Sequence, residues 1–313
     1  MMFILSCEKI ENGGGIYSYE LAKSGELIRT RYYACDRPMY AVKCDSGLCV
    51  LLRQPFSDSD NSGYFYIDEE LKNATEIKST RGKCACHLCV DGDNVYIVNY
   101  LSGNIVKNGE DVSQRSGKSV HPIRQTSPHT HFVGKTPDGN YIVCDLGTDS
   151  LCFYNKELKL VDEEKVPTGY GIRHIVFSKN GKYIYAMNEL VPSVSVFSYK
   201  DHSAVLLNTQ IIDCKNKSAN GAAIRISECG RYLYSSIREE NIICVFEIKG
   251  ENILLLQKNS CGGDSPRDFN IINNLLICCN ENSDNISVYR LKNGKVSERL
   301  CDFKLNKPLC CVV

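Results

Sequence analysis

Arginine, histidine and carboxylate side chains stand at the ends of short apolar strands in this sequence. His129 and His131 have the two-residue spacing that places both side chains on one face of a strand. Arg173 begins another strand, and Asn188 and Glu189 end the strand that follows it. Arginine recognises carboxylates and phosphates through paired hydrogen bonds, whereas an imidazole or a carboxylate can activate water as a general base. These residue types predict a site that binds an anion and hydrolyses a bond in it.

The clearest local element is a hairpin between Gly169 and Lys200. Two short apolar strands, Ile172–Ser178 and Tyr183–Met187, flank the dipeptide Asn180-Gly181. Asn-Gly between alternating apolar residues is the strongest short-range signal for a hairpin turn. A third strand, Ser193–Tyr199, follows and alternates in the same way.

Antiparallel pairing across this turn places Arg173 opposite Asn188, with Glu189 one position beyond. A basic and an acidic side chain are therefore expected to meet at the open end of the hairpin. The same turn-centred alignment places other polar residues at equivalent positions along the chain.

The hairpin belongs to an internal repeat of about 40 to 50 residues. Each unit has strand, tight turn, strand, short loop and strand, followed by a more variable fourth strand such as Leu158–Val161 or Ile253–Gln257. The units begin near Met39, Cys86, His129, Arg173, Ala222 and Arg267. Four strands per such period predict an all-β fold, a seven-bladed β-propeller of four-stranded blades.

The ends of the chain supply the seventh unit. Residues 307–313 read as a first strand, and residues 1–37 read as the remaining three. Pairing of the N- and C-terminal strands would close the array and remove exposed sheet edges. We therefore expect a single domain over residues 1–313.

In a propeller, the first strand of each blade lines the central channel, so its start and the end of the second strand emerge at one mouth. This topology collects the polar residues on one rim. The candidate catalytic residues are His129, His131, Arg173 and Glu189, and the candidate substrate-binding residues are His87, Asp145, His174, Asn188, Arg238 and Arg267.

Structural roles are the alternative for several of these residues. Asn and Asp after a strand are common turn residues, which applies to Asn188 and Asp145. Arg173 and Glu189 could form only a salt bridge, and a lone histidine on a strand is usually a satisfied structural group.

Composition excludes several classes of function. The 37 basic and 37 acidic residues give no net charge, so the composition does not favour binding to nucleic acid or to an anionic membrane surface. No apolar run reaches the roughly 18 residues of a membrane span, and the N-terminus lacks the features of a signal peptide. The 18 cysteines lie largely within apolar alternations, as expected for reduced strand residues of a cytoplasmic protein.

The cluster from Cys84 to Cys89 resembles metal-ligand spacing, but it lacks a second ligand pair, and alternation along a strand would divide it between two faces. We therefore expect no metal and no cofactor. The expected partner is a small anionic molecule, and the expected state is a monomer or a weak homo-oligomer.

Several segments resemble a known family. SPHTHFVGKTPDGNYIVCDLGTDSLCFY, GYGIRHIVFSKNGKYIYAMNEL and HPIRQTSPHTH are similar to the blades of lactonase-type seven-bladed propellers. That family includes the cycloisomerase-type 6-phosphogluconolactonases of bacteria and the carboxy-muconate cyclases of fungi. The resemblance implies a lactonase of the oxidative pentose phosphate pathway that opens 6-phosphoglucono-1,5-lactone to 6-phosphogluconate.

The resemblance also implies roles for particular residues. It points to the SPHTH histidine, Arg173, Glu189 and Arg238. Glu189 or a histidine would activate water, Arg173 would stabilise the oxyanion, and Arg238 or Arg267 would hold the phosphate.

The chain departs from the family pattern at Ala223, where a glutamate is usual. The alternatives are therefore another lactone, a muconate-type cycloisomerisation, or a non-catalytic propeller that binds a protein or sugar.

Overall fold

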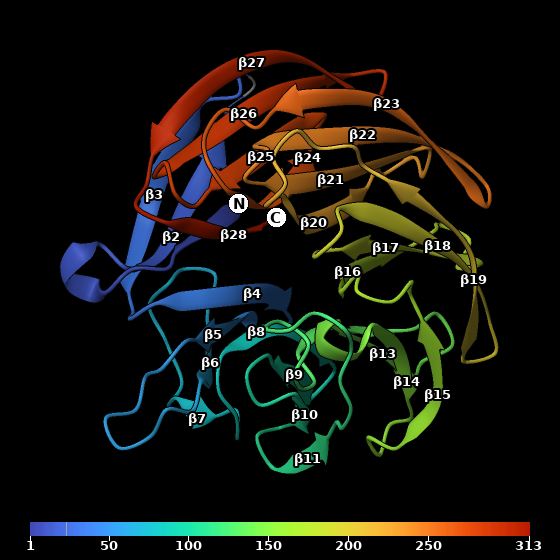
Figure 1. Cartoon of the computed structure of the whole chain (residues 1–313). Helices are drawn as coiled ribbons and strands as arrows, with labels where there is room; N and C mark the ends of the chain where they lie inside the picture. Colours follow the sequence, from blue (N-terminus) through green and yellow to red (C-terminus); the bar gives the residue numbers. More distant parts are fainter. Residues whose placement is uncertain (23) are drawn as a thin grey trace. The chain divides into compact units, whose positions relative to one another are not determined.

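The computed structural model describes residues 1–22 and 24–313. These residues form seven four-stranded sheets, and their helical segments are two three-residue 3₁₀ turns, η1 (Ile10–Asn12) and η2 (Leu146–Thr148) (Figure 1). The strands within each sheet pair in antiparallel fashion. The predicted all-β propeller of four-stranded blades is confirmed.

The chain divides into two compact units. The first comprises Met1–Val50, Tyr66–Thr75 and Cys214–Val313, and the second comprises Leu51–Phe65 and Glu76–Asp213. The single-domain assignment of residues 1–313 stays a prediction.

Three complete sheets belong to the first unit. They consist of β28 (Pro308–Val312), β1 (Met2–Ser6), β2 (Gly15–Leu21) and β3 (Leu27–Ala34); of β20 (Asn220–Ile226), β21 (Tyr232–Arg238), β22 (Ile242–Lys249) and β23 (Asn252–Ser260); and of β24 (Pro266–Ile272), β25 (Leu275–Asn280), β26 (Asn285–Lys292) and β27 (Lys295–Lys304). A further sheet consists of β4 (Pro38–Cys44), β5 (Gly47–Leu52), β6 (Gly63–Ile67) and β7 (Lys78–Ser79).

The second unit contains the other three sheets. They consist of β8 (Ala85–Asp91), β9 (Asn94–Asn99), β10 (Asn104–Lys107) and β11 (Asp111–Gln114); of β12 (Thr130–Lys135), β13 (Tyr141–Asp145), β14 (Ser150–Tyr154) and β15 (Leu160–Lys165); and of β16 (Ile172–Phe177), β17 (Tyr183–Asn188), β18 (Ser193–Lys200) and β19 (Ser203–Ile211).

The predicted strands of the central hairpin agree with β16, β17 and β18 to within one residue at each end. The fourth strand of the preceding sheet was predicted wrongly, because β15 begins at Leu160 rather than at Leu158. Leu158 has a left-handed backbone with φ of 55° and closes a turn by donating its N–H to the carbonyl of Asn155. A residue in that conformation ends a turn and cannot start a strand.

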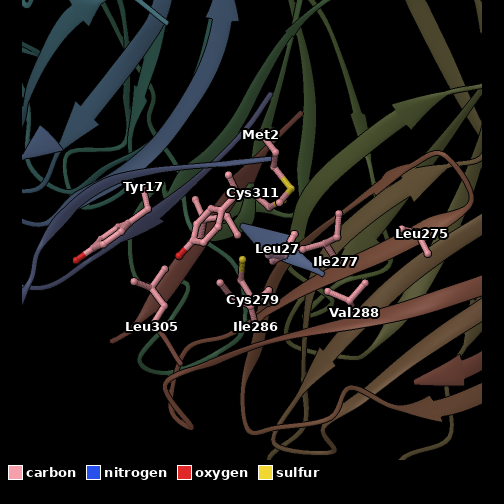
Figure 2. Packing of buried hydrophobic residues seen from close by; sticks show 12 residues of the cluster. Met2, Tyr17, Leu27, Leu275, Ile277, Cys279, Ile286, Val288, Leu305 and Cys311 are labelled. Carbon is pink, nitrogen blue, oxygen red and sulfur yellow. The ribbon is translucent and has the colours of Figure 1, made fainter. Parts of the chain in front are cut away.

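The terminal strands pair as the sequence predicts. In the first unit, β28 lies antiparallel to β1, with Ile4 opposite Cys311 (Figure 1). Side chains from this sheet and from the sheet of β24 to β27 form one apolar cluster. Its members include Met2, Tyr17, Ile277, Cys279, Val288 and Cys311 (Figure 2). Leu276 and Cys278 of β25 belong to a second apolar cluster, so this strand is covered on both faces and reads as a nearly continuous apolar run.

A β-bulge recurs near the start of the first strand of several sheets. The register with the second strand shifts at Cys86, at His131, at Arg173 and at Arg267, so each of these is the extra residue of a bulge. The expected register holds from Phe177 back to His174. Beyond it, Ile172 rather than Arg173 lies opposite Asn188, which corrects the predicted pairing. A bulge re-aims the side chain of its extra residue, and here it does so at predicted site positions.

Most of the 18 cysteines are buried, as the alternation pattern predicts. Cys144, Cys152, Cys278 and Cys310 are fully enclosed, and burial raises the pKa of each thiol. In the described part of the chain, no helix has the length and apolar character that crossing a membrane requires.

Replacement of Ile4 by alanine tests the terminal pairing. Ile4 is fully buried in the cluster of the first unit, whereas Ile28 on β3 of the same sheet is 49% exposed. We expect Ile4→Ala to lower the free energy of unfolding by about 2–5 kcal/mol through lost packing and a residual cavity. Ile28→Ala should change it by no more than about 0.5 kcal/mol. Urea unfolding of both variants measures the difference, and equal effects would contradict the packing described.

Candidate active site

Glu189 lies at the centre of a buried ion network in the second unit. Its Oε2 lies 2.8 Å from Nε of Arg173, and its Oε1 accepts a hydrogen bond of 2.5 Å from Nη2 of Arg124. The side chains of Glu189 and Arg173 are only 3% exposed, while that of Arg124 is 35% exposed. Buried charges are tolerated when they are paired, and here one carboxylate serves two guanidinium groups. The predicted meeting of Arg173 and Glu189 is therefore part of a larger network.

Different elements supply the members of this network. Arg173 is the bulge residue of β16, and Glu189 follows β17, where its backbone N–H donates to the carbonyl of Gly171 at 2.7 Å. Arg124 comes from the segment between β11 and β12. Its Nε donates to the hydroxyl of Tyr100 at 3.1 Å, which fixes the guanidinium at a second point.

The buried carboxylate of Asp149 holds these segments in place. It accepts hydrogen bonds from Oγ of Ser119 and Nε2 of Gln125, which flank Arg124 in sequence, at 2.5 and 2.7 Å. It also accepts from the backbone N–H groups of Gly169 and Gly171 at 2.7 and 2.6 Å. Because Gly171 in turn binds the backbone of Glu189, one carboxylate positions both sides of the ion network.

His129 is held at its backbone and at its ring. Its backbone N–H donates to the carboxylate of Asp145 at 2.8 Å, and its ring Nδ1 lies 2.9 Å from the carbonyl oxygen of Tyr100. The ring also stacks on that of Tyr100, with 4.4 Å between centroids. A carbonyl oxygen only accepts hydrogen bonds, so Nδ1 carries the proton and Nε2 carries the lone pair of the neutral ring. The imidazole is thus held in the tautomer that can take a proton through Nε2.

Three further histidines, His87, His131 and His174, form a cluster beside this network. His174 lies edge-on to His131 and to His87, with ring centroids 5.1 and 5.2 Å apart. His131 also lies edge-on to the ring of Tyr100. Nη1 of Arg173 lies 3.4 Å from both ring nitrogens of His174, so the guanidinium rests against the imidazole. The structure therefore brings together six residues predicted for the site: His87, His129, His131, Arg173, His174 and Glu189.

Asp145 makes contacts that account for its burial without a substrate. The contacts of Asn188 satisfy its side-chain nitrogen, while its buried Oδ1 has no hydrogen-bond partner among the described residues. Asp145 accepts from the backbone of His129 and from Nε of Arg115, and it caps η2. The side-chain amide of Asn188 donates to the hydroxyls of Ser193 and Ser195 on β18. Both are fully buried, which agrees with the structural alternative for these positions.

Arg238 and Arg267 belong to the first unit, whereas the network above belongs to the second. Nη2 of Arg238 donates to the carbonyl of Gly221 at 3.4 Å. Arg267 is half-buried and forms no ion pair or hydrogen bond to residues 1–22 or 24–313. Ala223, at the position where the family resemblance implies a glutamate, is buried in a cluster with Phe269 and Tyr234. Its methyl group packs in the core of this unit.

Sequence reasoning missed Tyr100, Arg124 and Asp149. Arg124 lies within HPIRQTSPHTH, so the segment that carries the family resemblance contained a signal for it. Tyr100 and Asp149 carry no comparable sequence signal, because their roles depend on contacts to distant segments. Among the described residues, no group of three histidine, cysteine or acidic side chains is arranged to hold a metal ion.

Substitution of Asp149 by asparagine tests the anchor. Asn tolerates the left-handed backbone of this residue, with φ of 56°, so the change removes the carboxylate charge and not the turn. We expect a loss of about 1–3 kcal/mol in unfolding free energy, because buried donors lose a charged acceptor. Asp111→Asn, at an exposed position on β11, is the matched control. Equal thermal unfolding of the two variants would show that the anchor contributes nothing.

Glu163 gives a prediction for stability at low pH. Burial disfavours its ionised form, but hydrogen bonds from Lys165 and Ser150 and the charge of Arg115 outweigh this and lower the pKa of Glu163 to about 2 from 4.5. A lowered pKa stabilises the fold above about pH 4.5, and this contribution is lost as the pH falls towards 2. The difference in unfolding free energy between wild type and Glu163→Gln should therefore shrink over that range. Urea titrations at several pH values measure it, and a constant difference would contradict the assignment.

Comparisons with known proteins agree with the fold and the sequence segments described above. Residues 2–313 match the family model described as lactonase, 7-bladed beta-propeller. The chain is 30% identical to the uncharacterized protein YwcC of Lactococcus lactis, over 97% of this chain and 98% of that protein.

Solved structures give the same result. A Bacteroides fragilis protein provisionally named a 6-phosphogluconolactonase superposes with a TM-score of 0.89 at 26% identity, covering 99% of this chain and 96% of that one. The periplasmic gluconolactonase PpgL of Pseudomonas aeruginosa has a TM-score of 0.87 at 21% identity, covering 99% and 98%, and shares the fold. With its family match over almost the whole length and its seven four-stranded sheets, the chain belongs to the lactonase family of seven-bladed β-propellers.

Proposed function

We propose that this protein hydrolyses a small anionic sugar lactone, and that 6-phosphoglucono-1,5-lactone is the substrate. The observation that carries the proposal is the juxtaposition, within a lactonase-family chain, of the Arg124–Glu189–Arg173 network and the oriented imidazole of His129. Lactone opening needs a base for water and a cation for the developing oxyanion, and both are present.

His129 is the proposed general base. Nε2 of its neutral ring accepts a proton from water while the water oxygen attacks the lactone carbonyl carbon. Arg173 donates to the carbonyl oxygen as negative charge develops on it. The bond between the carbonyl carbon and the ring oxygen then breaks, and the ring oxygen receives the proton from Nε2, which leaves a hydroxy acid. Water is consumed, and no oxidation occurs.

Glu189 is assigned a positioning role in this scheme. Both of its oxygens contact guanidinium groups, at 2.8 and 2.5 Å, so both are already committed to cations. It therefore holds Arg173 and Arg124 in place, and the base is the histidine.

The cellular setting follows from the same proposal. A chain with 18 cysteines, most of them buried within strands, suits a reducing compartment, so the proposed location is the cytoplasm. There, hydrolysis of 6-phosphoglucono-1,5-lactone would be a step of the pentose phosphate pathway.

The test is hydrolysis of freshly prepared 6-phosphoglucono-1,5-lactone, measured above its spontaneous rate and beside glucono-1,5-lactone and a muconolactone. His129→Ala should lower kcat roughly 10²–10⁴-fold. Added imidazole should partly restore the activity of this variant, which loss of structure would not allow. Arg173→Ala should lower kcat roughly 10²–10³-fold. Glu189→Gln should lower activity as well, through mispositioned arginines.

Asp111→Asn serves as the control variant for purification and folding. Wild-type protein indistinguishable from buffer on the whole panel would refute lactone hydrolysis and favour a binding propeller. Activity confined to the muconolactone would favour the cycloisomerase alternative.

A further inference from the structure

Arg124 presents part of its guanidinium group to solvent in a fixed orientation. Nε donates to Tyr100 and Nη2 donates to Glu189, which leaves both N–H groups of Nη1 and the second N–H of Nη2 without a partner among the described residues. The side chain is 35% exposed, in contrast to the 3% of Arg173. The edge formed by Nη1 and Nη2 is the one that binds the two oxygens of a carboxylate or phosphate.

The charge balance of the network also favours an anion. Two guanidinium groups share one carboxylate, so the three side chains carry a net positive charge. Burial works against the charge of Arg124, but the Glu189 carboxylate outweighs it and raises the pKa of Arg124 above its ordinary value. Arg124 therefore stays cationic at neutral pH.

The segment that carries Arg124 is built as a rigid support. Gln125, the next residue, donates its side-chain amide to the carbonyl of Leu146 and to Asp149. Ser119 and Gln125 close the segment by a backbone hydrogen bond of 2.9 Å. A pre-oriented arginine loses little conformational entropy on binding, which makes it more effective than a flexible surface arginine.

We propose that Arg124 is the anion-recognition residue of this site and that it binds the phosphate of the substrate through its Nη1–Nη2 edge. This inference rests on the proposed function for the identity of the substrate, but the anion contact itself does not require catalysis. It assigns the contact to a residue other than Arg238 or Arg267, the candidates suggested by the sequence.

Phosphate and carboxylate share this chemistry, and binding measurements separate them. The probes are 6-phosphogluconate, which carries both groups, glucose 6-phosphate, which carries the phosphate, and gluconate, which carries the carboxylate. Isothermal titration calorimetry with wild type identifies which group is recognised. We expect Arg124→Ala to weaken binding of the recognised group at least tenfold.

Two further variants separate recognition from folding. Arg124→Lys keeps the charge but loses the paired donors, so it should recover only part of the affinity. Tyr100→Phe removes the acceptor that orients Nε and should weaken binding less than Arg124→Ala. Arg290→Ala removes an exposed arginine of β26 and is the matched control, expected to bind like wild type. Thermal unfolding of each variant identifies any loss of structure.

Kinetics give an independent readout if the lactone is hydrolysed. Arg124→Ala should raise KM more than it lowers kcat, because the anionic group lies away from the reacting carbonyl. Equal affinity in Arg124→Ala and wild type, or no binding of any probe by wild type, would overturn the inference. So would loss of affinity in Arg267→Ala with retention in Arg124→Ala. Arg124-dependent binding without hydrolysis of any lactone would refute the proposed function and support the anion site.

Discussion

The pairing of one buried carboxylate with two arginines is the interaction on which the candidate site depends. The charge of Glu189 allows Arg173 to be buried beside the histidines. Glu189 also pairs with Arg124, which lies 65 residues earlier in the sequence. Without the carboxylate, two guanidinium groups would repel each other in a partly desolvated setting. The same pairing commits both oxygens of Glu189 to guanidinium groups.

A second carboxylate holds together the backbone segments that carry the network. Asp149 binds the segment before β12 and the glycines before β16, and Gly171 passes the constraint on to Glu189. Asp149 therefore fixes the backbone of these segments, and Glu189 fixes the side chains of the two arginines. Rigid support of this kind is what a site requires to hold donors in a productive geometry.

The repeat explains how one blade design produces different side-chain environments. A bulge in the first strand recurs at Cys86, His131, Arg173 and Arg267, so the backbone re-aims one side chain in each of these four blades. The asparagine that ends the second strand is structural in several blades: Asn188 binds serines of β18, and Asn280 binds Ser287 of β26. The side chain at the bulge therefore differs from blade to blade, while the asparagine makes a similar contact in both of these blades.

The sequence by itself determined the blades, the pairing of the terminal strands and the meeting of Arg173 with Glu189. These features follow from local turn signals and from alternation, which act over a few residues. Tertiary structure decided the rest. The bulge at Arg173 shifts the register by one residue, and no local signal marks it. Arg124, Tyr100 and Asp149 join the site through contacts between segments distant in sequence, and such contacts exist only after the blades have packed together.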